Sequence, residues 1–393
     1  MEWKVFSLSD IAHYSQGKQI PLNLQYLELN ELRERFIRIV DFTSNWSQEP
    51  RFVDKDPKYL VNIDDIVMIR YGTPGKVFRG HKGIIANNLF KITFNEEIID
   101  KDYAYWYLNQ DSVYKQLMAG QSSSTMPAIT FGMLKYIMVR VPPISYQRRI
   151  ASILSSLDRK IELNNKINAD LEEMAQAIFK NWFVDFEPFK DGKFVDSELG
   201  MIPEGWKVGT LGDITKNKSA KVKERNDVKV LSPVTNGELV LSEEYFTKQV
   251  FSSSIAKYKI VNKGDFAYNP ARVNIGSLGR NEFDFDGCVS PVYVVFSVLD
   301  GYENYFDLFR KTDFFKDSVA SLAIGGVRQS LSYDDLSLIE TIIPSENIVE
   351  EFNNLYNEMK KTIKTNKLEN SRLSLLRDTL LPRLMSGELE VPE

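Results

Sequence analysis

Residues 144–180 read ISYQRRIASILSSLDRKIELNNKINADLEEMAQAIFK, directly after the pair Pro142-Pro143. Apolar residues recur here at alternating steps of four and three, the period of a helix that packs against another helix. The positions of this seam are Ile150, Leu154, Leu157, Ile161, Leu171, Ala175 and Ile178. The spacing predicts one helix of roughly 37 residues, about 55 Å long.

A second stretch of the same kind follows Pro344 near the end of the chain. Its seam positions are Phe352, Tyr356, Met359, Ile363, Leu373, Arg377 and Leu380. In each stretch, the two seam positions that the apolar residues skip hold asparagine: Asn164 and Asn168 in the first, and Asn366 and Asn370 in the second. Polar seam residues cost stability but fix register. We expect an antiparallel pair in which the asparagines meet; two separate amphipathic helices are the alternative.

The segments that precede the two helices also repeat. Trp3-Lys4-Val5 recurs as Trp206-Lys207-Val208, at an offset of 203 residues. Asn62 and Asp65 match Asn262 and Asp265 at an offset of 200. Six positions from 129 to 142 match six from 331 to 344 at an offset of 202. Between these anchors the copies differ almost completely, which predicts two copies of one fold with a constant framework and a variable middle.

These patterns together predict an α+β protein. Two mixed α/β domains are joined by two long antiparallel coiled-coil helices, and the whole has a pseudo-twofold internal repeat. The expected boundaries are 1–141, 142–200, 201–343 and 344–393. Within the domains, β-rich runs predict strands at 65–70, 90–94 and 291–297, and aromatic-faced segments predict helices at 102–118 and 303–320.

Composition restricts the function classes. The chain has 393 residues and is 43% hydrophobic, but it lacks a run of 18 apolar residues, so we expect no membrane span. The single cysteine, Cys288, excludes an internal disulfide framework, and the start has no secretory signal pattern. We therefore expect a cytoplasmic protein. The net charge of −5 argues weakly against a nucleic-acid partner, although binding depends on local patches.

Known catalytic motifs are missing. The only histidines are His13 and His81, and neither has a cysteine nearby, which argues against a zinc site. The sequence contains no nucleophile elbow and no phosphate-binding P-loop. The stretch from Asn269 to Arg272 lacks the second proline and the aromatic residue of an amino-methyltransferase motif. A recognition module is favoured over an enzyme.

Loops within each domain carry side chains suited to DNA. Arginine reads guanine, asparagine reads adenine, and lysine neutralises phosphate. The candidates in the first domain are Arg70, Tyr71, Lys76, Arg79, Lys82, Ser123 and Thr125. Those in the second are Lys221, Lys223, Asn269, Arg272, Asn274, Arg280, Arg328 and Gln329. For any one of them, ordinary charge on a solvated loop is an equal alternative.

Several longer stretches carry a family resemblance. They are QRRIA at 147–151, LDRKIELN at 157–164, MAQAIFKNWF at 174–183, LGMIPEGW at 199–206 and LLRDTLLPRLMSGEL at 375–389. Together they resemble the conserved regions of the specificity subunits of type I restriction–modification enzymes. The resemblance covers the whole chain and is more specific in the helical regions than in the domains. Because the chain begins at Trp3 with little before it, we expect any N-terminal conserved segment to be short.

The resemblance implies a non-catalytic subunit with two target-recognition domains. Each domain would read one half of a bipartite site in double-stranded DNA, and the helices would set the gap between the halves. Two methylation subunits, which use S-adenosylmethionine, would dock on the helices, and two restriction subunits, which use ATP and Mg, are further implied partners. No cofactor or metal is expected to bind this chain directly.

Three points stay open on the sequence alone. Apolar residues near Trp182, Phe183 and Phe186 fit a docking surface, but they could equally close a core. A same-fold recognition subunit of another modification or restriction system is one alternative function. A coiled-coil scaffold with two domains that bind ligands other than DNA is a second.

Overall fold

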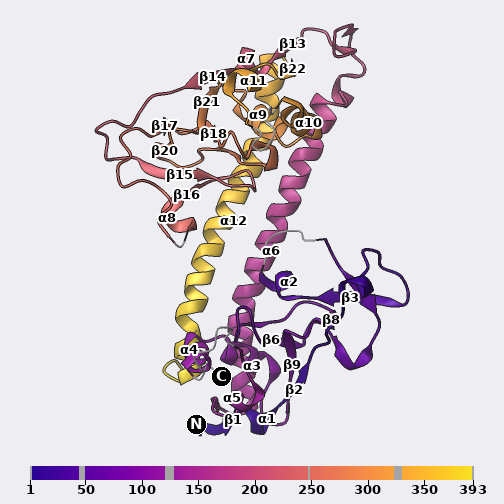
Figure 1. Cartoon of the computed structure of the whole chain (residues 1–393), viewed down its shortest axis with the longest axis vertical. Coiled ribbons are helices and arrows are strands. Elements are labelled where there is room, and N and C mark those ends of the chain that lie inside the picture. Colours follow the sequence, from indigo (N-terminus) through magenta and orange to yellow (C-terminus); the bar gives the residue numbers. More distant parts are fainter. Residues whose placement is uncertain (1, 44–48, 120–127, 247, 323–329, 392–393) are drawn as a thin grey trace. The chain divides into compact units, whose positions relative to one another are not determined.

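A computed structural model of the chain describes residues 2–43, 49–119, 128–246, 248–322 and 330–391 (Figure 1). The chain divides into two compact units, residues 1–165 with 367–393, and residues 166–366. Each unit contains one globular domain and parts of both long helices, α6 (Ile144–Phe183) and α12 (Glu346–Ser386). We call the globular part that precedes α6 the first domain, and the globular part between α6 and α12 the second domain.

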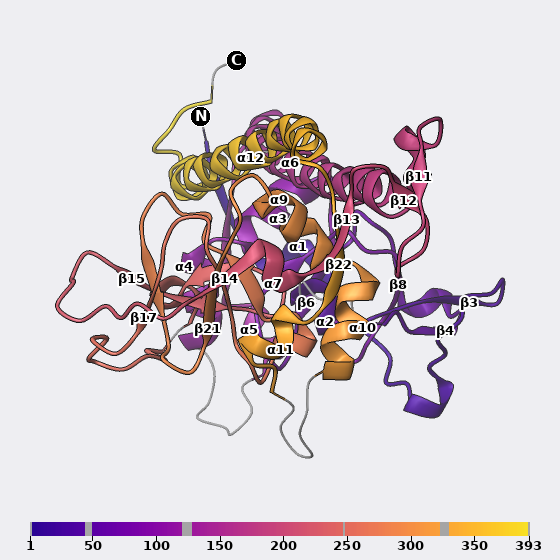
Figure 2. The same ribbon diagram turned by 90° about the horizontal axis from the view of Figure 1, so that it is seen from above.

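Within each unit, the parts of α6 and α12 run side by side in opposite directions (Figures 1 and 2). In the first unit, Arg377 of α12 pairs with Asp158 of α6 at 2.5 Å. In the second unit, Phe183 of α6 packs edge-on against Phe352 of α12, with ring centroids 5.0 Å apart. As the residue number rises in one helix it falls in the other, so the predicted antiparallel pair is confirmed.

The four seam asparagines lie in contact across the pair. In the first unit, the Asn164 amide donates to Asn370 Oδ1 at 2.9 Å and to Glu369 Oε2 at 2.7 Å. In the second unit, Asn366 Nδ2 donates to Asn168 Oδ1 at 2.9 Å. Asn164 is fully buried. That these contacts select the register stays a prediction.

Within its described residues, the first domain has three small sheets. Strand β1 (Lys4–Ser7) pairs with β10 (Met138–Val141). One four-stranded sheet has the order β2 (Ala12–Gln16), β9 (Leu89–Phe94), β6 (Ile66–Ile69) and β7 (Val77–Phe78). The other has the order β4 (Phe52–Asp54), β3 (Arg33–Ile37), β8 (Gly83–Ile85) and β5 (Leu60–Val61). The α-helices are α1 (Leu8–Ile11), α2 (Ile39–Thr43), α3 (Lys101–Leu108), α4 (Asp111–Ala119) and α5 (Phe131–Leu134).

The second domain has the same strand pairings. Strand β13 (Lys207–Thr210) pairs with β22 (Glu340–Ile343). The two four-stranded sheets have the orders β14 (Thr215–Lys218), β21 (Val294–Val298), β18 (Phe266–Tyr268), β19 (Leu278–Arg280), and β16 (Leu239–Leu241), β15 (Lys229–Pro233), β20 (Gly287–Val289), β17 (Lys259–Val261). The α-helices are α7 (Leu211–Ile214), α8 (Ser242–Tyr245), α9 (Glu303–Phe309), α10 (Asp313–Leu322) and α11 (Tyr333–Ser337). A short hairpin of β11 (Phe194–Val195) and β12 (Ile202–Pro203) precedes the domain.

The repeat extends to the direction of the strands. Among the strands of the described residues, β3 pairs with β8 and β15 with β20 in parallel, and the other strand pairs are antiparallel. The repeated Asn and Asp anchors form the same turn. The carboxylate of Asp65 accepts from the backbone N–H of Asn62 at 2.7 Å, and that of Asp265 from Asn262 at 2.9 Å. The internal repeat predicted from the sequence is confirmed. Its anchor residues lie in equivalent turns and paired strands of the two domains.

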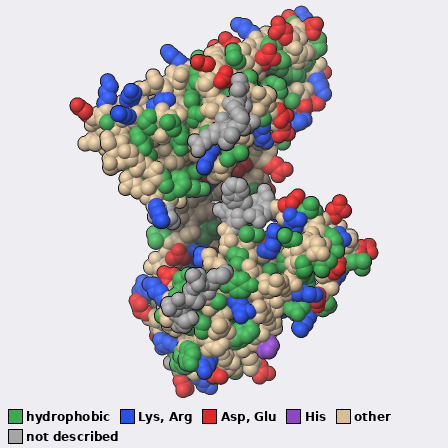
Figure 3. Space-filling view, in the orientation of Figure 1, with side chains coloured by type: hydrophobic (Ala, Val, Ile, Leu, Met, Phe, Trp, Pro, Cys, Tyr) green, Lys and Arg blue, Asp and Glu red, His purple; other side chains and the backbone are tan. Residues whose placement is uncertain are grey.

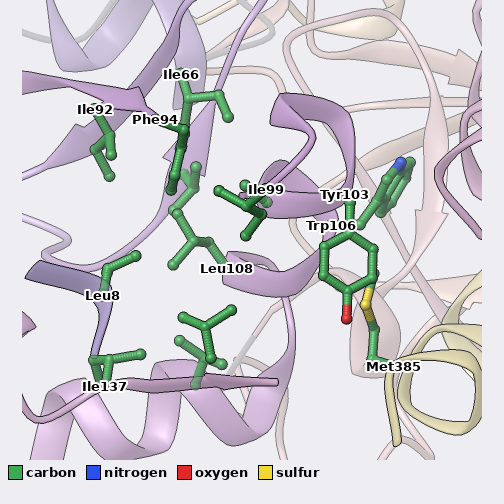
Figure 4. Close-up of a cluster of buried hydrophobic side chains, with 14 of the residues drawn as sticks. Leu8, Ile66, Ile92, Phe94, Ile99, Tyr103, Trp106, Leu108, Ile137 and Met385 are labelled. Atoms are coloured by element: carbon green, nitrogen blue, oxygen red, sulfur yellow. The ribbon is translucent and has the colours of Figure 1, made fainter. Parts of the chain in front are cut away.

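The long helices complete the core of each domain. Leu381, Leu384 and Met385 of α12 belong to the core of the first domain, and Figure 4 shows Met385 beside Tyr103 and Trp106. Phe183 of α6 is buried in the core of the second domain, with Trp182 packed against it. The aromatic residues at the end of α6 therefore close a core, which decides between the two expectations for this cluster.

The predicted helix at 102–118 is wrong as a single element, and so is the one at 303–320. Helix α3 ends at Leu108, where the Asn109 side chain donates to the Tyr105 carbonyl at 2.9 Å. Helix α9 ends at Phe309, and the Thr312 hydroxyl accepts from the backbone N–H of Phe315 at 3.3 Å, at the start of α10. Side chains that bond the local backbone compete with a continuous helix.

Arg310 fixes the position of the β18–β19 hairpin in the second domain. It pairs with Asp307 at 2.6 Å, and both side chains are more than 90% buried. Its guanidinium also donates to the carbonyls of Leu278, at 2.8 Å, and Gly237, at 3.1 Å. Burial would raise the pKa of Asp307, but the charge of Arg310 holds that pKa well below its ordinary value. The pair therefore connects the end of α9 to the start of β19 and to the turn at Gly237.

We predict that the double variant Asn164→Leu, Asn370→Leu melts at the same or a higher temperature and loses its single register. Two leucines replace a hydrogen-bonded polar pair with apolar contact, which stabilises the seam but removes what distinguishes one register from another. Circular dichroism measures the melting temperature, and light scattering after size exclusion measures the mass distribution. A single sharp monomeric species, indistinguishable from the parent, would contradict a role in register.

We predict that Arg310→Met destabilises the chain by about 3–5 kcal/mol, because it leaves the Asp307 carboxylate buried without its partner. The pair's contribution is present above the ordinary carboxyl pKa of about 4 and is lost as pH falls, since the folded-state pKa is the lower one. Urea unfolding at pH 7 and at pH 4 measures both effects. The loss should be smaller at pH 4, and Arg310→Lys should fall between the parent and Arg310→Met. Equal stability of all three would refute this role.

Candidate nucleic-acid interface

The hairpin between β6 and β7 carries the first candidates. Arg70 and Tyr71 are half-buried at its start, and Lys76 is exposed at its end. The hairpin is closed by the bond from Gly75 N to the Ile69 carbonyl at 2.8 Å. Gly75 has a φ of 84°, and a Cβ there would lie 3.1 Å from the Met118 side chain, so glycine suits this turn. The fold thus presents a basic tip on a tightly closed turn.

The hairpin between β18 and β19 takes the same place in the second domain. The backbone of Asn269 bonds to that of Ser277 at 3.1 Å, and the Asn269 side chain accepts from the N–H of Ala271, also at 3.1 Å. Arg272 and Asn274 are exposed on the tip. At Gly276 a Cβ would meet the Thr235 carbonyl at 2.5 Å, so the hairpin lies directly against a neighbouring turn.

In each domain a second candidate segment meets the hairpin. The backbone N–H of Ile129 donates to the Arg70 carbonyl at 2.8 Å, and Tyr71 forms a bridge with Ala128. In the second domain the N–H of Leu331 donates to the Pro270 carbonyl at 3.1 Å. The candidates Ser123, Thr125, Arg328 and Gln329 come just before these points and lie outside the described residues. In both copies, described residues far apart in sequence therefore meet: 128 and 129 with 70 and 71, and 331 with 270.

Two predicted DNA contacts make matching contacts within the protein. Arg79 pairs with Asp102 of α3 at 2.5 Å and lies over the Tyr105 ring. Arg280 donates to the Asn304 side chain of α9 at 2.9 Å. Arg79 directly follows β7 and Arg280 is the last residue of β19, and each side chain reaches the first turn of a later helix. The structure gives them a positioning role in the scaffold, whatever else they contact.

The other predicted basic residues lie elsewhere on the domains. Lys82 is exposed just before β8, and Lys221 and Lys223 are exposed on the loop between β14 and β15. Lys223 N bonds to the Ala256 carbonyl at 2.9 Å, and its φ of 55° is left-handed. Arg225 in the same run pairs with Asp227 and Asp286. Lysines 221 and 223 thus remain the exposed cations of this loop.

Sequence reasoning missed a hollow of about 380 Å³ beside the second hairpin. Asn269 and Arg272 line it together with the aromatic side chains of Tyr258 and Tyr293. The sequence placed Tyr293 inside a strand, but β21 begins at Val294, after a turn in which Tyr293 N bonds to the Ser290 carbonyl at 3.0 Å. Its proline-containing start, Ser290-Pro291, was the signal for that turn.

Charges of both signs are interspersed on the face of each domain seen in Figure 3. Across the described ranges, we find no group of three or more His, Cys, Asp or Glu side chains that could hold a metal ion. Within the same ranges, no helix is both long and apolar enough to cross a membrane. At the tips of the two hairpins, Lys76 and Arg272 are exposed to solvent.

Comparison with known proteins agrees with this architecture. The family model described as type I restriction modification DNA specificity domain matches residues 1–173. The MjaIX specificity subunit of Methanocaldococcus jannaschii is 28% identical over 322 residues, which cover 79% of this chain and 74% of that protein. The HindI specificity subunit of Haemophilus influenzae is 24% identical over 377 residues, covering 78% of this chain and 81% of that one.

A solved structure has the same fold. The crystal structure of the type I restriction–modification S subunit from M. genitalium aligns with a TM-score of 0.59, covering 98% of this chain and 96% of that one at 15% identity. Four observations agree with the resemblance found in the sequence: the internal repeat, the helix pair, the family model and the relatives that match most of the chain. The chain is similar over most of its length to specificity subunits of type I restriction–modification enzymes, and the DNA specificity domain model matches its first 173 residues.

Proposed function

We propose that this chain is the non-catalytic subunit that reads a bipartite DNA site for a type I restriction–modification complex in the cytoplasm. Each domain reads one half of the site with its own hairpin. The observation that carries the proposal is that one scaffold occurs twice, with β6–β7 and β18–β19 in the same place but with different side chains at the tips. A constant scaffold with variable tips suits two different half-sites.

The tips differ in the chemistry that reads bases. The first hairpin has Arg70 and Lys76, which suit guanine and phosphate. The second has Asn269 and Arg272 beside the aromatic hollow, which suit adenine and guanine edges. Because the net charge is −5, the chain alone is expected to bind DNA weakly, and the partner subunits supply much of the basic surface.

Under this proposal α6 and α12 set the gap between the half-sites. A helix of 40 residues, such as α6, is about 60 Å long, compared with about 34 Å for one turn of DNA. Apolar residues exposed on the helices offer docking positions for two methylation subunits: Leu163, Leu368 and Leu375 in the first unit, and Met174 and Leu355 in the second. S-adenosylmethionine belongs to the methylation subunits, and ATP and Mg belong to the restriction subunits of the complex.

The first test is a comparison of methylated adenines between the host and a strain without this gene, by single-molecule sequencing. We expect one bipartite motif with a fixed gap to lose methylation, because no other subunit would supply that reading. Returning the gene should restore the same motif. An unchanged methylome, also after expression with the neighbouring methylation subunit in a clean host, would contradict the proposal.

The second test separates the two half-sites. We predict that Arg70→Ala and Arg272→Ala each relax recognition of a different half by about 1–3 kcal/mol, because each tip reads its own half. The measurement is the affinity of the complex with methylation subunits for duplexes substituted in one half or the other. Equal effects of both variants on both halves would refute separate reading.

The matched control for this test is the pair Lys221→Ala, Lys223→Ala. These lysines are exposed on a loop and suit phosphate rather than bases. We expect weaker binding to every duplex alike, with the slope of log affinity against log salt reduced by about 2. A change in sequence preference would instead place this loop among the base-reading elements.

A further inference from the structure

The hairpin of β18 and β19 is bonded to α12 through a buried side chain, that of Asn304 at the start of α9. The guanidinium of Arg280, the last residue of β19, donates to Asn304 Oδ1 at 2.9 Å. Asn304 Nδ2 donates in turn to Asn353 Oδ1 and to Asn357 Oδ1 of α12, both at 3.0 Å (Figure 1). One amide therefore bonds the end of the hairpin on one side and the long helix on the other.

Both ends of the Asn304 amide are in use, and the side chain is only 8% exposed. Its partner Asn353 is itself held, because the Asn353 amide donates to the Gly301 carbonyl at 2.6 Å. A buried polar group that loses its partner has no water to replace it, so a shift of the hairpin relative to α12 is costly. The amide thus fixes the base of the hairpin against the helix.

Two ion pairs connect the residues just after β19 to the same helix. Lys360 of α12 pairs with Glu282, and Lys364 pairs with Asp284 at 3.4 Å. The side chains of Glu282, Asp284 and Lys364 are 59–69% exposed, so salt screens these pairs and they contribute little. The contact through Asn304 is buried, and we therefore assign the fixing of the hairpin to it.

The hairpin is short and braced, so its tip follows its base. Each of its strands has three residues, and Arg280 at the end of β19 lies opposite Phe266 at the start of β18. Closer to the tip, Arg310 of the buried ion pair donates to the Leu278 carbonyl at 2.8 Å. The orientation in which the exposed Arg272 is presented consequently depends on how the base is held.

The first domain divides these two tasks between different residues. At the position 202 residues earlier, Asp102 of α3 pairs with Arg79 at 2.5 Å. Bonds from α3 to α6 come from elsewhere on that helix, since Trp106 Nε1 donates to Ser155 Oγ at 2.9 Å. In the second domain one amide does both, so a change at Asn304 reaches the hairpin and the long helix together.

We propose that Asn304 is a positioning residue for the reading of the second half-site. It holds the β18–β19 hairpin in one orientation relative to α12, so that Asn269 and Arg272 meet base edges in one geometry. The inference rests on the proposed function, in which this hairpin reads bases. Hydrogen bonds weaken steeply with misalignment. A hairpin that pivots therefore keeps its attraction to phosphates and loses its preference among bases.

The test compares Asn304→Leu with the parent, each as the full chain in complex with the methylation subunits. Leucine has a similar branched shape but cannot form a hydrogen bond to Arg280 or to α12. The probes are the bipartite duplex found by methylation mapping and duplexes substituted in one half. The measurement is the ratio of the affinities for the intact and the substituted duplex.

We expect the ratio for the second half to fall roughly tenfold in Asn304→Leu and the ratio for the first half to stay that of the parent. A loss of stability alone lowers the folded fraction and therefore every affinity alike, so it leaves both ratios unchanged. The two ratios thus separate positioning from a merely structural role.

The matched control is Thr341→Val in the same domain. Thr341 is 2% exposed, and its hydroxyl lies 3.2 Å from that of Tyr305, the residue after Asn304 on α9. The substitution removes a buried hydrogen-bonding group beside the same helix and leaves the contacts of Asn304 in place. We expect both ratios of this control to equal those of the parent.

The double variant Asn353→Ala, Asn357→Ala removes only the α12 end of the link and serves also if Asn304→Leu fails to fold. It should lower the second-half ratio in the same direction. A parent-like second-half ratio in either variant, an equal loss in both halves, or an equal loss in the Thr341→Val control would overturn the inference. A parent complex that does not distinguish the substituted duplexes would instead refute the proposed function itself.

Discussion

The last turns of α12 pack into the core of the first domain, where Leu381, Leu384 and Met385 lie among side chains from the other end of the chain. The Tyr146 hydroxyl accepts from the backbone N–H of Val391 at 2.9 Å, and Arg140 donates to the Ser386 carbonyl. The core of the first domain is thus incomplete until the last turns of α12 have packed into it. This requirement accounts for the order of α6, second domain and α12 along the chain, because α12 runs antiparallel to α6 and so brings its last turns back to the first domain.

The core of the second domain is completed in the same way, because α6 supplies Phe179 and Phe183 to it. Each domain therefore takes core residues from both long helices. Within the first unit, Asn164 with Asn370 and Asp158 with Arg377 join the two helices, and within the second unit Asn366 with Asn168 does so.

The repeated scaffold separates what holds the fold from what differs between the copies. The turn carboxylates of Asp65 and Asp265, and the contacts of Arg79 and Arg280 with the following helix, occur in both domains. The hairpin tips and the connections after β2 and β14 differ. The first connection is rich in leucine, and the second holds Lys221, Lys223 and Arg225. Under the proposed function, different tips on a shared framework suit two different half-sites.

Local spacing along the chain was sufficient to predict the two helices, their asparagine positions and the internal repeat, whereas the family came from a resemblance of whole stretches of sequence. Periodicity and repetition can be read along the sequence itself, so they can be recognised without knowledge of the fold. The breaks after Leu108 and Phe309 were missed, because they depend on single side chains that bond the backbone.

Other features were decided only by tertiary structure. Contacts between distant segments bring Ile129 to Arg70 and Leu331 to Pro270, and they place Tyr293 in the hollow with Arg272. Contacts of this kind also bury Phe183 in the core of the second domain. A pattern of residue types shows that a side chain is apolar or charged, but only the packed chain determines what lies opposite it.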